Sequence, residues 1–254
     1  MKILNKLKVK LKVVCIIQAR TGSTRLPGKV LKKICGKTVL EHDIDRLRRI
    51  KNVDEIVIAT TNKKQDDLIV NEALRLGVKY FRGSEEDVLS RYYYAAKMTK
   101  ADIVMRVTSD CPLIDSEVSK NILNYYLKNS KCYDYVSNTI KRTYPRGLDV
   151  EVFSFKALKR AFLEAKSNRD REHVTPYIWG NVDDFRIGQY VNEIDYSELR
   201  WTLDTEEDFQ LINKIYEHLY YKLGNDFYMK DILKLYESYK ELYNINKDIM
   251  QKHI

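Results

Sequence analysis

The chain has 254 residues, 44% of them hydrophobic, and a net charge of +9 at neutral pH. This size and composition fit one large domain with a substantial core and argue against a disordered or low-complexity chain. No apolar stretch approaches the roughly 18 residues that a membrane span needs, and the start of the chain lacks the apolar core of a signal peptide. We therefore expect a cytoplasmic protein with no membrane span.

The basic charge is concentrated at the start of the chain. Residues 1–40 contain eleven of the 45 Lys and Arg residues and no Asp or Glu, whereas the rest has 34 basic and 36 acidic residues. A nucleic-acid-binding protein would spread its basic residues over a face or along a helix. The local excess instead favours a small polyanionic ligand, and no nucleic-acid partner is expected. Residues 1–12 form a basic N-terminal extension, which either adds to this charge or is a solvated tail without a role.

The first predicted element is a short buried strand at 13–17, which ends in a loop that runs from Ala19 to Lys29. This loop contains glycines, hydroxyl side chains, Arg20, Arg25 and Lys29, and no acidic residue. A strand followed by a glycine-rich basic loop binds phosphate groups through backbone N–H groups and cationic side chains. The loop matches neither the Walker A sequence nor GxGxxG.

Helices and strands alternate as far as residue 127. Thr38 and Glu41 form a capping box before the first helix, and the later periodicities predict strands at 55–60, 78–82 and 102–107 and helices at 65–76, 86–98 and from Asp115 or Ser116 to 127. This alternation predicts a parallel sheet covered by helices on both faces, with ligands bound beyond the carboxyl ends of the strands.

The pattern changes after residue 132. We expect short strands at 133–137, 148–153, 185–191 and 200–203, and helices at 155–166, 169–179, 205–223 and, as one or two segments, 229–250. The prediction is a single domain over 13–254, with an irregular part at 132–200 and C-terminal helices at 205–250.

Two aspartates follow predicted strands. Asp110 comes directly after the strand at 102–107, and Asp204 lies just before a helix. Two carboxylates with waters and phosphate oxygens make an ordinary Mg²⁺ site. Each aspartate also has a simpler explanation as a turn or helix cap, although Thr205 already occupies the capping position beside Asp204.

Other charged residues suggest acceptor binding. Asp149 and Glu151 share one face of a predicted strand, where they bind a polyol or line a solvated edge. The run from Arg169 to His173 either offers donors to an anionic acceptor or forms a surface ion-pair cluster. Asp43 and Asp45 resemble a DxD element, but we reject it as a metal site because it lies within a helix.

Several motifs together resemble one known family. In order, they are IIQARTGSTRLPGKVL, RVTSDCPLID, YDYVSNT, YPRGLDVEVFS, REHVTPYI and RWTLDTEEDF. They are similar to the SpsF group of spore coat polysaccharide biosynthesis proteins, within the cytidylyltransferase superfamily that contains CMP-Kdo and CMP-sialic acid synthetases. The resemblance covers about Val13 to Tyr220.

The resemblance implies an α/β fold of the Rossmann-like nucleotidyltransferase (GT-A-like) type, with three layers around a mixed, mostly parallel sheet. It implies Mg²⁺ held by Asp110 and Asp204, and Lys29, Arg20 and Asp110 as catalytic residues. The nucleotide-binding positions are Ala19, Arg20, Thr21, Gly22, Ser23, Arg25, Lys29, Thr60, Gly83, Ser84 and Asp110. The positions assigned to the acceptor are Arg146, Asp149, Glu151, Arg171, Glu172 and His173.

The expected activity is transfer of CMP from CTP to an acidic sugar or related small anionic acceptor, with release of pyrophosphate, in surface polysaccharide or glycan biosynthesis. The resemblance also implies a homodimer formed near 133–150 and 180–195. A glycosyltransferase that uses a nucleotide sugar on the same general fold is the alternative, and it would release no pyrophosphate. The identity of the acceptor stays open.

Overall fold

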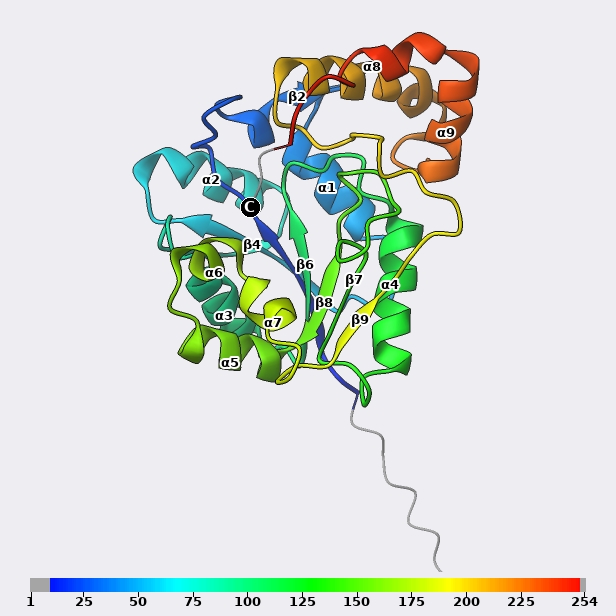
Figure 1. The fold of residues 1–254 in the computed structure, drawn as a ribbon. Helices are drawn as coiled ribbons and strands as arrows, with labels where there is room; N and C mark the ends of the chain where they lie inside the picture. Colours follow the sequence, from blue (N-terminus) through cyan, green and yellow to red (C-terminus); the bar gives the residue numbers. More distant parts are fainter. Residues whose placement is uncertain (1–9, 252–254) are drawn as a thin grey trace, which may run out of the picture.

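A computed structural model describes residues 10–251, so most of the basic extension predicted at 1–12 lies outside the described residues. A seven-stranded sheet forms the centre of the molecule (Figure 1), in the order β5-β4-β1-β6-β8-β7-β9. Its strands are β1 (Val13–Gln18), β4 (Glu55–Thr61), β5 (Lys79–Gly83), β6 (Ile103–Thr108), β7 (Tyr135–Ser137), β8 (Glu151–Ser154) and β9 (Ile187–Gln189). β5, β4, β1 and β6 are parallel, β8 is antiparallel to β6 and β7, and β9 is parallel to β7. The mixed, mostly parallel sheet is confirmed.

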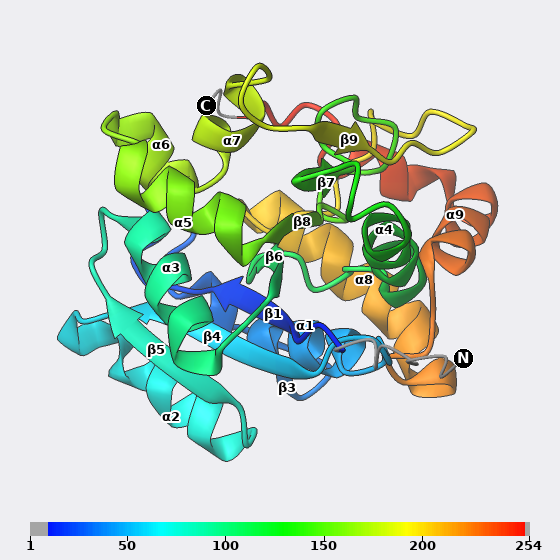
Figure 2. The ribbon, with the colours of Figure 1, turned by 90° about the horizontal axis from the view of Figure 1, so that it is seen from below.

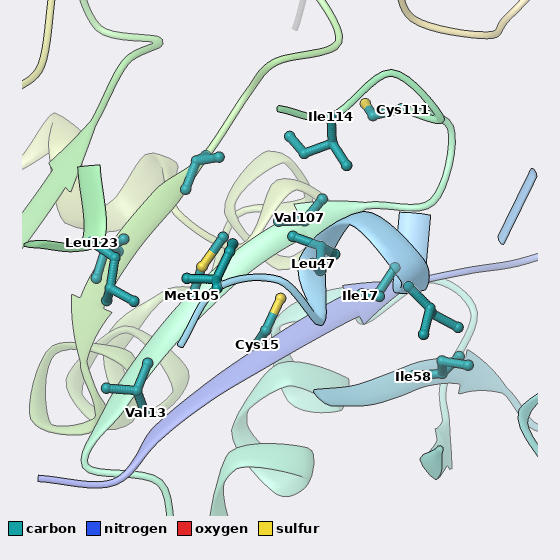
Figure 3. Packing of buried hydrophobic residues seen from close by; sticks show 14 of the residues in the cluster. Val13, Cys15, Ile17, Leu47, Ile58, Met105, Val107, Cys111, Ile114 and Leu123 are labelled. Atoms are coloured by element: carbon teal, nitrogen blue, oxygen red, sulfur yellow. The ribbon is translucent and has the colours of Figure 1, made fainter. Parts of the chain in front are cut away.

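Helices cover both faces of this sheet (Figure 2). One face packs against α1 (Val39–Leu47), α2 (Asp67–Arg75) and α4 (Ser116–Lys128), and the other against α3 (Val88–Thr99), α5 (Phe155–Glu164) and α7 (Pro176–Gly180). β1 shows why: Val13, Cys15 and Ile17 belong to the first core cluster (Figure 3) and alternate with Val14 and Ile16 of the second. Side chains alternate across a strand, so a wholly apolar strand is buried on both sides. The expected three layers are therefore confirmed.

A third core cluster lies under the C-terminal helices. α8 (Glu206–Leu223) and α9 (Met229–Ser238) pack there around Trp201 and Phe227. The 3₁₀ helix η3 (Lys240–Asn244) follows α9. A small hairpin, β2 (Lys33–Ile34) and β3 (Lys37–Thr38), contributes Ile34 from the other side. Within residues 10–251, no helix combines the length and the apolar character of a membrane span.

The irregular part differs from the predicted elements in three places. The helix expected at 169–179 is two helices, α6 (Asn168–His173) and α7, because Val174 has a φ of 74° and Pro176 has no N–H to donate. The strand expected at 148–153 begins only at Glu151, so Asp149 lies in the preceding loop. The strand expected at 200–203 is a single bridge between Arg146 and Arg200.

Candidate functional site

The loop after β1 is held by a buried aspartate. The backbone N–H and the Oγ1 of Thr21 donate to Asp66 Oδ1 at 2.8 and 2.6 Å, and the Thr61 hydroxyl donates to the other oxygen. Asp66 is fully buried just before α2. Gly28, with a φ of 67°, turns the chain so that its N–H reaches the Thr21 carbonyl at 3.0 Å. These bonds fix the loop at the carboxyl end of the sheet.

This loop forms one wall of a cavity of about 260 Å³, which we name the β1 cleft. The cleft collects residues from the ends of β1 and β6, from α3 and α6, and from the start of α8. Its lining consists of Gln18, Ala19, Arg20, Ser23, Thr24, Arg25, Lys29, Val30, Val88, Arg91, Thr108, Ser109, Asp110, Glu172, His173 and Asp204. The structure thus brings together most of the predicted nucleotide-binding, catalytic and metal-binding residues.

Lys29 joins the two aspartates across the cleft. Its Nζ lies 2.7 Å from Asp110 Oδ2 and 2.8 Å from Asp204 Oδ1. Lys29 begins the 3₁₀ helix η1 (Lys29–Leu31), Asp110 follows β6, and Asp204 precedes α8. Arg25 also contacts Asp204, at 2.9 Å. Residues that are 81 and 175 positions apart therefore meet at one point.

These contacts keep both partners charged. Burial alone would raise the pKa of Asp110, but the charge and hydrogen bond of Lys29, together with bonds from Thr108 and Cys111, lower it to about 2. Burial also disfavours the charged form of Lys29 and by itself would lower its pKa. The two aspartates instead raise the pKa of Lys29 above its ordinary value. Asp110 is therefore a carboxylate, able to bind cations, at neutral pH.

Asp204 is positioned by a second buried aspartate. Asp208 Oδ2 accepts from the backbone N–H groups of Asp204 and Thr205 at 2.9 and 3.0 Å, in the predicted capping box. Arg200 contacts both aspartates, and the Leu203 N–H donates to the Asp110 carbonyl oxygen at 2.8 Å. Because Thr205 and Asp208 complete the cap, the Asp204 side chain faces the cleft instead of capping the helix.

A smaller cavity of about 210 Å³, which we name the Arg146 pocket, adjoins the β1 cleft at the two aspartates. It shares Arg25, Thr108, Asp110 and Asp204 with the β1 cleft and adds Cys111, Arg146, Gly147, Asp149, Thr202 and Gln251. In the described part of the chain Arg146 has no carboxylate within ion-pair distance, whereas Arg142 binds Asp149 at 2.5 and 2.8 Å. Burial and the neighbouring Arg142 lower the pKa of Arg146. Its guanidinium is available for an anion.

Five predicted nucleotide-binding residues do not line the cleft. Thr60 is fully buried in β4. Side chains alternate along a strand, so Thr60 and its neighbour Thr61 point to opposite faces, and it is Thr61 that contacts Asp66. Thr21 is directed to Asp66, and Gly22 packs against Gln65 and Glu85, although both belong to the loop that forms the wall. Gly83 and Ser84 lie at the end of β5, where the Ser84 Oγ accepts from the Asp87 N–H at 3.1 Å.

Among the predicted acceptor residues, Arg146 and Asp149 line the Arg146 pocket, whereas Glu172 and His173 line the β1 cleft. Glu151, predicted either to bind the acceptor or to line a solvated edge, lines neither cavity and does not lie at a solvated edge. It is buried, and its carboxylate binds Arg106, the Tyr135 hydroxyl at 2.6 Å and the Thr175 hydroxyl at 2.5 Å.

Arg171 likewise lines neither cavity. It pairs with Asp87 at the start of α3 and donates to the Phe162 carbonyl oxygen at 2.8 Å. For this residue the ion-pair alternative describes the structure.

Sequence reasoning missed three residues of the site. Asp66 carries no motif that separates it from other helix-start aspartates, because its role depends on a loop from elsewhere in the chain. The capping box predicted at Thr205 includes Asp208 but does not reveal that Asp208 also holds Asp204. Arg91 lies within the apolar periodicity of α3, and nothing in that pattern distinguishes it from a surface arginine.

The acidic pair fits a hard divalent cation. Within residues 10–251, no group of three or more His, Cys, Asp or Glu side chains is arranged to hold a metal. Asp110 and Asp204 face one ammonium from two different elements, and such a carboxylate pair binds Mg²⁺ when waters and substrate phosphates supply the other oxygens.

The chain was compared with known proteins. The sequence profile of the cytidylyltransferase family matches residues 14–253. An uncharacterized protein of Methanocaldococcus jannaschii is 40% identical, with 95% of this chain and 97% of that protein covered. The spore coat polysaccharide biosynthesis protein SpsF of Bacillus subtilis is 32% identical, with 81% and 86% covered.

Solved structures give the same result. A cytidylyltransferase from Leptospira borgpetersenii superposes with a TM-score of 0.88 at 34% identity, with 96% of this chain and 100% of that chain covered. A CMP:2-keto-3-deoxy-manno-octonic acid synthetase complexed with CTP superposes at 0.63 over 82% of this chain and 99% of that one, and at 18% identity it supports the fold alone. The match of the profile to almost the whole chain shows that this protein belongs to the cytidylyltransferase family.

Proposed function

We propose that this protein transfers CMP from CTP to a small anionic acceptor, with release of pyrophosphate, in the biosynthesis of a surface polysaccharide or glycan. The observation that carries the proposal is the position of Asp110 and Asp204 at the boundary of two cavities, with the cationic loop on one side. The SpsF relative and several 3-deoxy-manno-octulosonate cytidylyltransferase relatives support the reaction class.

The triphosphate of CTP fits the β1 cleft. Arg20, Arg25 and Lys29 line it, and the loop between them is fixed by Asp66 rather than by the ligand. A binding site that is ordered before the ligand arrives loses less entropy on binding. Cationic side chains and backbone N–H groups of this loop neutralise the β- and γ-phosphates.

The acceptor oxygen attacks the α-phosphorus and forms the new O–P bond, and any hydroxyl proton that it carries passes to water. The bond between the α-phosphorus and the oxygen that bridges to the β-phosphate breaks, and pyrophosphate leaves. Arg25 and Lys29 stabilise the charge that develops on pyrophosphate, which in phosphoryl transfer is a main source of rate. When Mg²⁺ is bound, Asp110 and Asp204 would hold it, and the ion would withdraw charge from the phosphate oxygens. Because Lys29 contacts both aspartates, it also fixes their positions.

The acceptor fits the Arg146 pocket. The guanidinium of Arg146 would bind a carboxylate or phosphate of the acceptor, and Asp149 and Thr202 offer polar groups for hydroxyls. The pocket opens onto Asp110 and Asp204, so an acceptor held there would lie beside these carboxylates and the α-phosphate.

We also propose that the protein is a homodimer that buries the segment near 180–195. Val191 and Ile194 in this segment are 45% and 60% exposed, and apolar side chains of this kind suit a contact between two copies. Analytical ultracentrifugation of the wild type and of the variant Val191→Asp/Ile194→Asp tests this. A dimer that dissociates in the variant is expected, whereas a monomeric wild type contradicts it.

The test of the reaction is a pyrophosphate-release assay. CTP, UTP, ATP and GTP are each offered with Mg²⁺ and a panel of acidic sugars and phosphorylated small molecules. We expect pyrophosphate only with CTP and one acceptor class. If a nucleotide sugar is consumed without pyrophosphate release, the protein is instead a glycosyltransferase.

A further inference from the structure

Arg91 of α3 is a buried cation in the wall of the β1 cleft. The residue is 2% exposed. Its Nη1 reaches the Ala59 carbonyl oxygen only at 3.5 Å, and within residues 10–251 its Nε has no hydrogen-bond partner and no carboxylate lies within ion-pair distance. Burial of a cation without acceptors costs free energy. Arg91 is therefore short of acceptors at a place where a ligand can supply them.

Other buried arginines of the fold are well partnered. Arg46 donates to the carbonyl oxygens of Ile114 and Phe227 at 2.5 and 2.8 Å, and Arg200 contacts Asp204 and Asp208. Burial and the charge of nearby Arg20 lower the pKa of Arg91, whereas the two aspartates raise that of Arg200. Arg91 thus has fewer hydrogen-bond acceptors than Arg46 and Arg200.

A glycine makes room for the Arg91 side chain. A Cβ on Gly83 in β5 would lie 2.9 Å from Arg91 Cγ, which is closer than real Cβ atoms approach. The stem of Arg91 is therefore fixed against β5, and its guanidinium lies at the carboxyl ends of β4 and β1, where Ala19 N–H also donates to the Ala59 carbonyl.

Arg91 and Asp110 lie on opposite sides of β1. Arg91 contacts β4, Asp110 follows β6, and both of these strands pair with β1. Two strand spacings separate them by roughly 10 Å, which suits a nucleotide whose α-phosphate faces Asp110 and whose base faces Arg91. Ala19 and Val88 supply apolar surface in the same cleft for a flat ring.

We propose that Arg91 selects cytosine over uracil by donating from its terminal nitrogens to O2 and N3 of the base. Cytosine presents two acceptors on this edge, whereas uracil presents O2 and an N3–H donor. A guanidinium has only donors, so it matches cytosine and leaves a donor facing a donor with uracil. This inference rests on the proposed function, because it assigns the base end of the same CTP site.

The test compares the wild type, Arg91→Met and Arg91→Lys with Lys97→Met, which removes an exposed cation from the same helix. Calorimetry measures dissociation constants for CTP, UTP and inorganic tripolyphosphate, each with Mg²⁺. We expect Arg91→Met to lose roughly 10- to 100-fold in CTP affinity, the range for one bidentate base contact. UTP and tripolyphosphate affinities should stay within about twofold, and Lys97→Met should match the wild type.

Tripolyphosphate binding also reports on the integrity of the fold. Arg91→Lys keeps the charge but lacks the paired donors of a guanidinium, so it should bind CTP more weakly than the wild type and show a smaller preference for CTP over UTP. Two results overturn the inference. One is a loss of tripolyphosphate affinity that is equal in Arg91→Met and Arg91→Lys. The other is a preference for CTP over UTP that is the same in these variants as in the wild type. A wild type that binds CTP and UTP equally also overturns it. A wild type that binds neither nucleotide refutes the proposed function itself, so the two failures are distinguishable.

Discussion

The ammonium of Lys29 lies 2.7 Å from the carboxylate of Asp110, within a site assembled from the loop after β1 and the loop after β6. Each group keeps the other charged despite burial: the pKa of Asp110 falls to about 2, and that of Lys29 rises. Asp204 completes the cluster at 2.8 Å from the same ammonium. Lys29 therefore links Asp110 and Asp204 in one cluster of charges.

Lys29→Met should lower kcat/KM by roughly 100- to 1,000-fold, as the loss of one positioned electrostatic donor does in other enzymes. The variant leaves two carboxylates facing each other and removes a cation from the phosphate loop. Steady-state pyrophosphate release measures the effect. Lys32→Met removes a neighbouring cation that instead contacts Glu206, and it should leave kcat/KM within about threefold. Equal activities of the two variants would contradict the role of Lys29.

The lowered pKa of Asp110 predicts an acid-sensitive contribution to stability. Its folded-state pKa lies below the ordinary 3.8, so this contribution is complete above about pH 4 and is lost as the pH falls through 2. The expected size is about 2 kcal/mol. Urea unfolding of the wild type and Asp110→Asn between pH 4 and pH 2 measures it, and the wild type should lose more. Parallel pH dependences would show that Lys29 does not hold the pKa down.

Asp204→Asn should reduce kcat/KM by roughly 100-fold and raise the Mg²⁺ concentration needed for half-maximal rate, because a neutral amide is a poor ligand for a hard cation. Glu206→Gln, two residues along the chain at an exposed position, is the matched control. An unchanged Mg²⁺ requirement in Asp204→Asn would assign this carboxylate to structure alone.

Arg146→Met should raise the KM for the acceptor by roughly 10- to 100-fold and leave the KM for CTP unchanged, since a hydrogen bond to a charged group contributes about 1.5–3 kcal/mol. Lys141→Met removes an exposed cation nearby and should change neither constant. A parallel rise in both KM values would place Arg146 with the nucleotide instead.

Gly147→Ala should destabilise the fold by about 3 kcal/mol or more. Gly147 has a φ of 101°, and an added Cβ would lie 2.6 Å from the Trp201 carbonyl carbon. Gly180 has open space around it, so Gly180→Ala is the matched control. Thermal unfolding measures both, and equal melting temperatures would contradict the close approach.

The sequence predicted those elements whose signals are local. The apolar run of β1 and the caps at Thr38 and Thr205 lie where they were predicted, and Asp115 is one of the two caps predicted for α4, because hydrophobic period and capping are encoded by neighbouring residues. Residues 132–200 were less predictable. Their strands are three or four residues long, and partners far along the chain decide where they begin.

The site residues divide in the same way, into those with a local sequence signal and those whose role depends on distant parts of the chain. Arg25, Lys29 and Asp110 could be assigned because a basic loop and a carboxylate follow strand ends, where parallel sheets bind ligands. The burial of Glu151 among Arg106, Tyr135 and Thr175 could not, because it depends on a segment at Thr175 that the broken helix brings back over β8.

The most direct test of the account is calorimetric binding of CTP with Mg²⁺ or with EDTA to the wild type and to Asp110→Asn. We predict that the wild type binds CTP at least roughly tenfold more tightly with Mg²⁺, and that Asp110→Asn loses this difference. An Asp110→Asn protein that keeps the full Mg²⁺ dependence of CTP binding would contradict the central claim, that this carboxylate and Asp204 bind the metal that accompanies the nucleotide.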